Sequence, residues 1–356
     1  MSTRPAPVPA EHRPTVAQTP SFLAVSRRRK VIGLLVSAGV LGAMCVVSLA
    51  VGTQYVSLPV VWHAVTDYRD IGDQWIVHDL RIPRTALALA VGLALGLSGT
   101  LIQAVARNPL ADTEVLGINS GAALFVVMAI AFLGLQSPWT YIWFAFIGAL
   151  VAMLAVYLVG WAVRDTTTPV RVLLAGVAVG AVLDGISFTV RLLKPRAFDN
   201  MRFWDAGALD GRSLEVVSVI TPFIVIGGVL CIAISRSLNT NALGDDVAKA
   251  MGTNVARTQT LSLVAVTLLA GAATAGAGPI GFVGLMVPHI VRRYTGPDWR
   301  WILAYATFVA PTLLLAADVV GRVVVPPAEL PAGIVTAFIG APVLIYVVRR
   351  SGGWQR

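Results

Sequence analysis

The feature of this chain that most restricts its fold is a series of apolar blocks, each about 15–25 residues long and separated by short charged or Pro/Gly-rich breaks. The hydrocarbon core of a bilayer offers no water to backbone polar groups, so a spanning segment must pair those groups within the protein. An apolar block of this length achieves this as a helix. The alternating strands of about ten residues that build membrane barrels are not visible. The sequence therefore predicts an all-α, polytopic membrane helix bundle.

The composition supports a membrane location for most of the chain. Only 13% of the 356 residues are charged, against about 25% in soluble proteins, and the mean hydropathy is +0.78. The sequence predicts ten spans, which form a single domain over residues 31–350. They are 31–51, 83–105, 117–135, 139–162, 171–191, 214–235, 258–276, 280–292, 301–320 and 331–348. The eighth span is short and contains Pro288, so a count of nine is the alternative to ten.

The distribution of basic residues predicts the orientation of the bundle. A net charge of +9 can indicate nucleic-acid binding, but in a membrane protein an excess of Lys and Arg marks the cytoplasmic segments. With the N-terminus inside, 18 of the 27 Lys and Arg residues lie in or beside cytoplasmic segments, so both termini are predicted to be cytoplasmic. Residues 1–30 are polar and Pro-rich and are predicted to be a disordered tail. A cleaved signal peptide is the alternative, but no clear small-residue cleavage site follows the first apolar block.

Several kinds of chemistry lack their sequence signature. No phosphate-binding GxxxxGK[ST] motif occurs, so any ATP hydrolysis is expected from a separate chain. The four His residues are scattered without metal-ligand spacing, and Cys45 and Cys231 lie inside apolar blocks as small hydrophobic residues. A membrane-embedded enzyme needs a cluster of His, Asp or Glu at one depth, which is not found. We predict no catalytic residue, no metal site and no cofactor.

An ion-coupled carrier needs ionisable groups within the bilayer, and only two carboxylates qualify clearly. They are Asp184 and Asp318. Asp318 precedes Arg322 by four residues, which is the spacing of an ion pair on one helix. This spacing favours a structural pair near the outer helix end over a proton relay.

The loop after the sixth predicted span has the pattern of a short amphipathic helix. Asp245 and Asp246 would lie in its first turn and Lys249 near its last, which suits the helix macrodipole. Val247 and Met251 would share one face. Such a helix is either a solvated connector or a docking element, and the pattern alone does not separate the two.

A set of long motifs occurs in a fixed order along the chain. They are RIPR at 81–84, SGTLIQ at 98–103, RNPLAD at 107–112, LGI at 116–118, LLAG at 173–176, GPIGFVGLMVPHIVR at 278–292, ELPAG at 329–333 and GAP at 340–342. In these motifs the chain resembles, over about residues 31–350, the permease subunits of ABC importers for ferric siderophores and cobalamin, the FecCD family. The ten-helix topology of that family agrees with the predicted spans.

The resemblance implies a transmembrane permease subunit of a binding-protein-dependent ABC importer in the cell inner membrane. The first choice of cargo is a ferric siderophore, with cobalamin and haem as alternatives and an ion-coupled secondary transporter as the alternative of a different class. The implied partners are an ATP-binding-cassette ATPase, an extracytoplasmic substrate-binding protein, a second permease subunit of the same or a sister chain, and membrane lipid. Nucleic acid is not among them.

The resemblance also implies roles for three arginines. Permeases of the family hold glutamates of the binding protein through arginines that match Arg81, Arg84 and Arg322, and the predicted orientation places all three outside. A guanidinium suits this role because it is always charged and binds a carboxylate through two hydrogen bonds. The alternative is that Arg81 and Arg84 anchor a helix end at the membrane interface.

The remaining implied sites are a coupling helix and a translocation path. The segment 243–252 is a relaxed version of the Glu-Ala-Ala-x-x-x-Gly pattern that fits a cleft in the ATPase. Its candidate coupling residues are Leu243, Gly244, Asp245, Asp246, Val247, Ala248, Met251 and Gly252. Path and gate are assigned to the fifth span and its entrance, with Thr167, Thr168 and Asp184. Asp184 either meets the cargo or is satisfied by Ser187 or a neighbouring helix.

Overall fold

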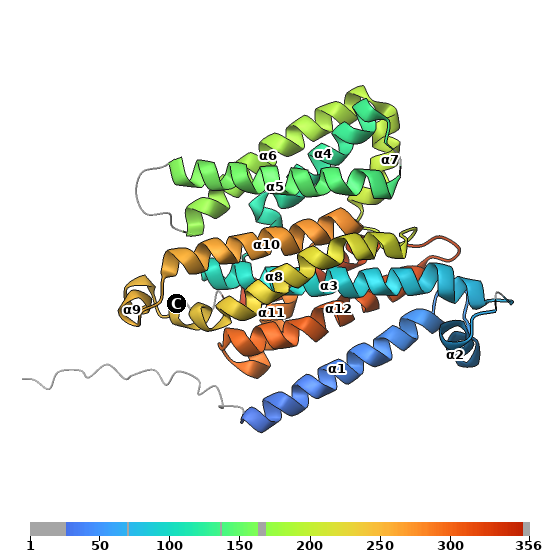
Figure 1. The fold of residues 1–356 in the computed structure, drawn as a ribbon, viewed down its shortest axis with the longest axis horizontal. Coiled ribbons are helices and arrows are strands. Elements are labelled where there is room, and N and C mark those ends of the chain that lie inside the picture. The colour runs from blue at the N-terminus through green and yellow to red at the C-terminus, as the bar shows by residue number, and fades with distance from the viewer. Residues whose placement is uncertain (1–25, 70, 136, 163–168, 352–356) are drawn as a thin grey trace, which may run out of the picture.

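The computed structural model describes residues 26–69, 71–135, 137–162 and 169–351, and every regular element in these ranges is a helix (Figure 1). The all-α prediction is therefore confirmed for the described part of the chain. In chain order the elements are α1 (Arg27–Ala50), α2 (Leu58–Thr66), η1 (Ile76–Arg81), α3 (Ile82–Ala106), η2 (Thr113–Leu116), α4 (Ile118–Leu133), α5 (Pro138–Ala162), α6 (Pro169–Leu193), α7 (Pro195–Asp205), α8 (Leu214–Asn241), α9 (Asp245–Ala250), α10 (Val255–Ala277), α11 (Val283–Thr295), α12 (Trp299–Val324) and α13 (Ala332–Ser351).

Each predicted span corresponds to one of these helices. Seven helices of the described residues are long and apolar enough to cross a membrane, and two more apolar helices, 118–133 and 332–346, are shorter. The predicted eighth span is α11, whose 13 residues extend about 20 Å at 1.5 Å per residue. A hydrocarbon core is about 30 Å thick, so the count of ten spans stays a prediction.

The long helices lie roughly along one axis and surround α3 (Figure 1). Of the candidate spans, α3 is the most deeply buried, and it contacts α8, α10, α11 and α12. Helices α4, α5, α6 and α7 form a group on one side of this centre, and α1 lies on the opposite side against α12. Short elements cap the two ends of the bundle, with α9 at one end and α2 at the other.

Glycines on α3 allow its neighbours to approach at backbone distance. A Cβ atom added at Gly92 would lie 2.5 Å from the Cα of Pro311, and one at Gly99 would lie 2.3 Å from the Cα of Gly284. Lipid chains are as apolar as leucine side chains, so membrane helices associate largely through such close contact. The small residues of α3 therefore explain how one helix can pack against α11 and α12 together.

The short helices α4 and α11 each follow a segment that interrupts the long helices, and these two segments lie close together inside the bundle. Phe282, the residue before α11, has φ +67° and provides no side-chain cap. The buried Asp112 caps η2, which leads into α4, and accepts a hydrogen bond from the backbone N–H of Thr113 at 2.6 Å. Its carboxylate also faces the backbone N–H of Phe282, so the two segments lie side by side.

We expect Gly99→Ala to destabilise the bundle by about 1–3 kcal/mol, because the added methyl group must displace backbone of α11. Thermal unfolding in detergent would measure this. Gly42→Ala in α1 is the matched control, since nothing lies within 4 Å of its added Cβ. Equal melting temperatures for the two variants would contradict close α3–α11 packing.

Candidate functional site

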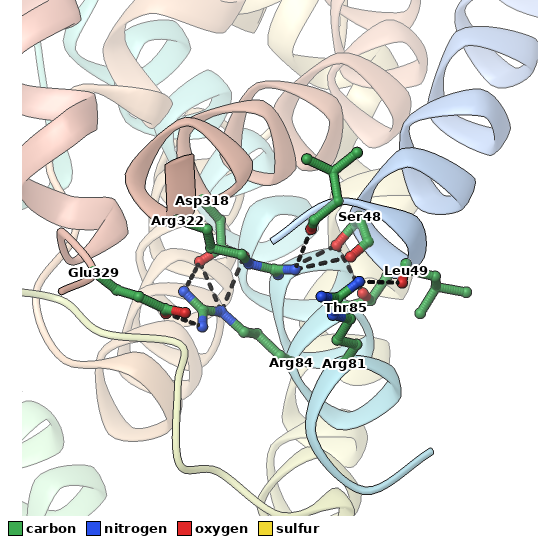
Figure 2. A network of polar contacts seen from close by, with 9 residues as sticks. Ser48, Leu49, Arg81, Arg84, Thr85, Asp318, Arg322 and Glu329 are labelled. Atoms are coloured by element: carbon green, nitrogen blue, oxygen red, sulfur yellow. Dashed lines mark hydrogen bonds and ion pairs between the residues drawn. The ribbon is translucent and has the colours of Figure 1, made fainter. Parts of the chain in front are cut away.

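The three arginines of the predicted docking site lie together at one end of the bundle, although they come from distant parts of the chain (Figure 2). Arg81 ends η1, Arg84 lies in the first turn of α3, and Arg322 lies in the last turn of α12. The contact of α3 with α12 brings them into one cluster.

Asp318 is the centre of this cluster. Its side chain has no exposed surface, and it accepts hydrogen bonds from Arg84 Nε at 3.0 Å and from Arg84 Nη2 at 2.8 Å. Arg322 Nη2 also donates to Asp318, one turn away on the same helix. The ion pair expected from the spacing of Asp318 and Arg322 is therefore present. A buried carboxylate that is held by two guanidiniums suits a structural role.

Further donor groups of Arg81 and Arg322 bind the end of α1 and the segment after it. Arg322 Nη1 donates to the carbonyl of Ser48 at 2.8 Å, and Arg81 Nη1 donates to the carbonyl of Leu49 at 2.8 Å. Arg81 also donates to the carbonyl of Gln54. The last carbonyl groups of a helix have no partner within it, so these arginines act as side-chain caps for α1.

A cavity of about 730 Å³ opens over the cluster and contains its one accessible ion pair. Arg84 Nη1 donates to Glu329 Oε2 at 2.5 Å, and the side chain of Glu329 is 32% exposed, against 11% for Arg84. The wall of the cavity carries four guanidiniums and three carboxylates, those of Arg81, Arg84, Arg212, Arg322, Asp79, Asp210 and Glu329. These charges nearly balance, so a partner would be recognised by short-range exchange of hydrogen bonds rather than by long-range attraction.

The structure thus brings the three predicted arginines together, but with their donors largely occupied. All three residues are buried, and each binds acceptors of its own chain. In the sequence Glu329 is the first residue of the ELPAG motif, and its contact with Arg84 was not predicted. Its position seven residues after Arg322 gave no signal, because the chain leaves the helix between them.

The predicted coupling segment contains helix α9, which is shorter than the predicted range. Leu243, Val247 and Met251 are 61%, 47% and 60% exposed, while Ala248 is fully buried. Leu243 precedes the helix and is separated from it by Gly244 with φ +105°, so the three residues form no single helical stripe but leave exposed apolar surface on and beside α9. Exposed apolar surface of this kind is typical of an interaction site, which favours the docking element of the two alternatives.

The ends of α9 have the geometry that its sequence pattern requires. Gly252 has φ +79°, and the N–H groups of Gly252 and Thr253 bind the carbonyls of Lys249 and Ala248. This arrangement is a Schellman motif, in which glycine is the favoured residue. Arg107, which follows α3, forms an exposed ion pair with Asp245 and so connects α9 to the end of the central helix. The sequence did not suggest this pair.

The arginine cluster and α9 lie at opposite ends of the bundle. Trp299 N, at the start of α12, binds Asn239 Oδ1 near the end of α8, close to α9 in the chain. Arg322 lies 23 residues further along α12, about 35 Å away at 1.5 Å per residue. This separation agrees with the predicted opposite placement of the two sites.

The candidate path residues are only partly described by the structure. Thr167 and Thr168 lie outside the described residues. Asp184 is exposed on α6 and accepts a hydrogen bond from Ser120 of α4 at 3.0 Å. Of the two partners considered for Asp184, the neighbouring helix supplies one, whereas Ser187 is buried and its hydroxyl has no hydrogen-bond partner in the described residues.

A further carboxylate lies beyond the end of α6. Asp205 of α7 pairs with Arg191, with Nη2 and Oδ1 3.3 Å apart. Burial raises the pKa of the Asp205 carboxyl and the charge of Asp184 adds to this, while Arg191 acts in the opposite direction. In the described residues no group of three or more His, Cys, Asp or Glu side chains is placed to hold a metal ion.

Comparisons with known proteins agree on one kind of protein. The chain is 45% identical over 329 residues to the ferric enterobactin transport system permease protein FepD of Escherichia coli (strain K12), covering 92% of this chain and 97% of that one. It is 40% identical to the Fe(3+)-citrate import system permease protein YfmD of Bacillus subtilis (strain 168), covering 78% and 83% of the two chains. The structure resembles an inward-facing conformation of a metal-chelate type ABC transporter with a TM-score of 0.79 and 25% identity, over 90% of this chain and 99% of that one.

The model of the FecCD transport family matches residues 40–350, which is most of the chain. The proteins of this family are permease subunits of ABC transporters and not ATPases, and the apolar helices agree with a multi-pass inner-membrane protein. The chain belongs to the FecCD transport family.

Proposed function

We propose that this chain is the transmembrane permease subunit of a binding-protein-dependent ABC importer and forms the translocation path for a ferric siderophore. The observation that carries the proposal is the presence of two distinct contact surfaces at opposite ends of one helix bundle. One is the arginine-walled cavity, and the other is the exposed apolar surface on and beside α9. The names of the relatives, ferric enterobactin and Fe(3+)-citrate permeases, favour a ferric chelate over cobalamin or haem.

An ion-coupled secondary transporter is the rival of a different class, and the contacts of its two candidate carboxylates disfavour it. Asp318 is buried and holds two guanidiniums, so its protonation would leave Arg322 without a counter-ion and Arg84 with Glu329 alone. Asp184 binds Ser120, and in the described part of the chain no ion pair connects it to Asp318. A proton relay needs ionisable groups that change partners along a path.

The arginine cavity is the proposed docking site for the extracytoplasmic binding protein. Arg84 is the residue best placed to exchange partners, because one of its two acceptors, Glu329, is itself partly exposed. A glutamate of the binding protein would replace Glu329 on Arg84, while Asp318 would keep the guanidinium in place. Arg81 and Arg322 would shape the cavity and hold the end of α1.

Residues 243–252 are the proposed docking site for the ATPase on the opposite side of the membrane. Their exposed apolar side chains would enter a cleft of the ATPase, and the ion pair of Asp245 with Arg107 would pass its movement to the end of α3. Two permease subunits, two ATPases and one binding protein would make up the importer. Closure of the ATPases would shift the bundle between inward- and outward-open states, through the difference in affinity for the two states.

The proposed path runs along α6, with Asp184 facing it and Thr167 and Thr168 at its cytoplasmic entrance. Asp184 is exposed in the single chain and uses one carboxylate oxygen for Ser120. The other oxygen is free to accept a hydrogen bond from cargo. No cofactor is needed for these roles.

Replacing Glu329 with Gln should tighten docking of the binding protein roughly two- to fivefold, because a partly exposed competing ion pair is weakened. The dissociation constant is measured with the chain in nanodiscs. Asp79→Asn is the matched control, since it removes a carboxylate from the same cavity wall without releasing Arg84. Weaker or unchanged docking by Glu329→Gln would contradict the exchange at Arg84.

Replacing Val247 with Glu should reduce association with the ATPase at least tenfold and abolish transport, because a charge would enter an apolar contact. Val247 is 47% exposed, so the melting temperature of the permease should not change. Val247→Ile, which keeps the apolar surface, should behave as the parent. Normal ATPase binding by Val247→Glu would exclude α9 as the coupling helix.

Uptake into vesicles reconstituted with the cognate ATPase and binding protein tests the cargo. Labelled ferric siderophore should accumulate when ATP is present inside the vesicles, while labelled cobalamin and haem should not. Accumulation that follows a proton gradient without ATP would instead support a secondary transporter. Preferential uptake of cobalamin or haem would leave the importer class intact and replace the proposed cargo.

A further inference from the structure

An open groove runs along one side of the bundle, next to the start of α1. It has a volume of about 910 Å³ and is walled by α3, α8 and α12, with Arg27 of α1 at its mouth. Helix α1 packs mainly on α12 and crosses the bundle as its outermost helix (Figure 1). The apolar side chains Val225, Val229 and Ile232 of α8 are 56%, 59% and 77% exposed along it.

The length of the groove corresponds to one leaflet of a bilayer. On α8 its lining extends from Ile224 to Ser235, which is about 16 Å at 1.5 Å per residue. Half of the hydrocarbon thickness is about 15 Å. An acyl chain of one leaflet would therefore fill the groove from its apolar end to its mouth.

The mouth carries two positive charges. Arg27 is the first residue of α1 and Arg300 is the second residue of α12, so both lie where helices begin at the same end of the bundle. Both side chains are exposed, and neither forms an ion pair within the described ranges of the chain. Trp301 lies beside them and has the Lys30 ammonium 5.9 Å from its ring. Aromatic and basic residues of this kind gather at the membrane–water interface.

We propose that this groove is a binding site for one anionic phospholipid of the cytoplasmic leaflet. An acyl chain lies along α8 between α3 and α12, and the headgroup phosphate is held by Arg27 and Arg300. The charge at the mouth selects an anionic headgroup, because basic pockets between helices on the cytoplasmic side attract such lipids. The bound lipid fills the groove beside the start of α1. The site is separate from the arginine cavity and from α9, so it can be tested independently of the proposed transport function.

The test is retention of lipid by the full chain in nanodiscs that contain equal amounts of phosphatidylglycerol and phosphatidylcholine. After mild delipidation, native mass spectrometry counts the lipids that remain bound. We expect the parent chain to retain phosphatidylglycerol over phosphatidylcholine by about 30-fold, as two arginines near the surface imply. The double variant R27Q/R300Q should lose most of this preference. R28Q/R257Q removes the same charge from exposed sites outside the groove and should keep it.

A second variant tests the acyl-chain part of the site without changing charge. A Cβ added at Gly228 meets only Leu97 Cδ1, at 3.9 Å, so Gly228→Leu can fold with its side chain in the groove. It should retain neither lipid, with an unchanged melting temperature. Equal retention of both lipids by the parent, equal losses by the two double variants, or bound phosphatidylglycerol in Gly228→Leu would each overturn the proposal. Parent chain without any bound lipid would also overturn it and would point to a protein occupant.

Discussion

The ion pairs of the buried Asp318 carboxylate are the interactions on which the arginine-cluster end of this bundle depends. This carboxylate has no exposed surface and holds both Arg84 and Arg322, which join α3 to α12 and to the end of α1. Removing one member of such a buried group typically costs about 3–5 kcal/mol, because the remaining charges lose their partner. The same carboxylate sets the position of Arg84, so the stability of this end and the geometry of the proposed docking site have a common origin.

This arrangement is compatible with buried arginines in the proposed docking site. A flexible exposed arginine loses side-chain entropy when a partner binds, whereas Arg84 is already held by Asp318. While no binding partner is present, Glu329 accepts the hydrogen bond of Arg84 Nη1, the guanidinium nitrogen that does not bind Asp318. The contact with Glu329 thus keeps a buried donor satisfied and leaves a site where a second carboxylate can enter.

The central helix connects the two ends of the protein. Its first turn contains Arg84, and its C-terminal neighbour Arg107 pairs with Asp245 of α9. Between them the glycines of α3 place its backbone directly against α11 and α12. Helices in such close contact move as one body more readily than helices separated by long side chains. A displacement of α9 can therefore be transmitted through α3 to the arginine cluster.

The sequence alone determined the helical class, the ten apolar segments and the grouping of charges at their ends. These properties depend on hydropathy and on local spacing, as the pair of Asp318 and Arg322 shows. The family motifs added the three arginines and the segment 243–252. The elements α2, η1, η2 and α7 were missed because they are much shorter than the apolar blocks of a membrane span.

Which of these groups meet depends on the packing of distant parts of the chain. The contacts of Arg84 with Glu329, of Arg107 with Asp245 and of Asp112 with Phe282 join residues more than a hundred positions apart. The same holds for the burial of the arginines, which sequence polarity alone would place in water. The physical reason is that a local pattern fixes which face of a helix is apolar, but the partner of that face depends on how all helices pack together.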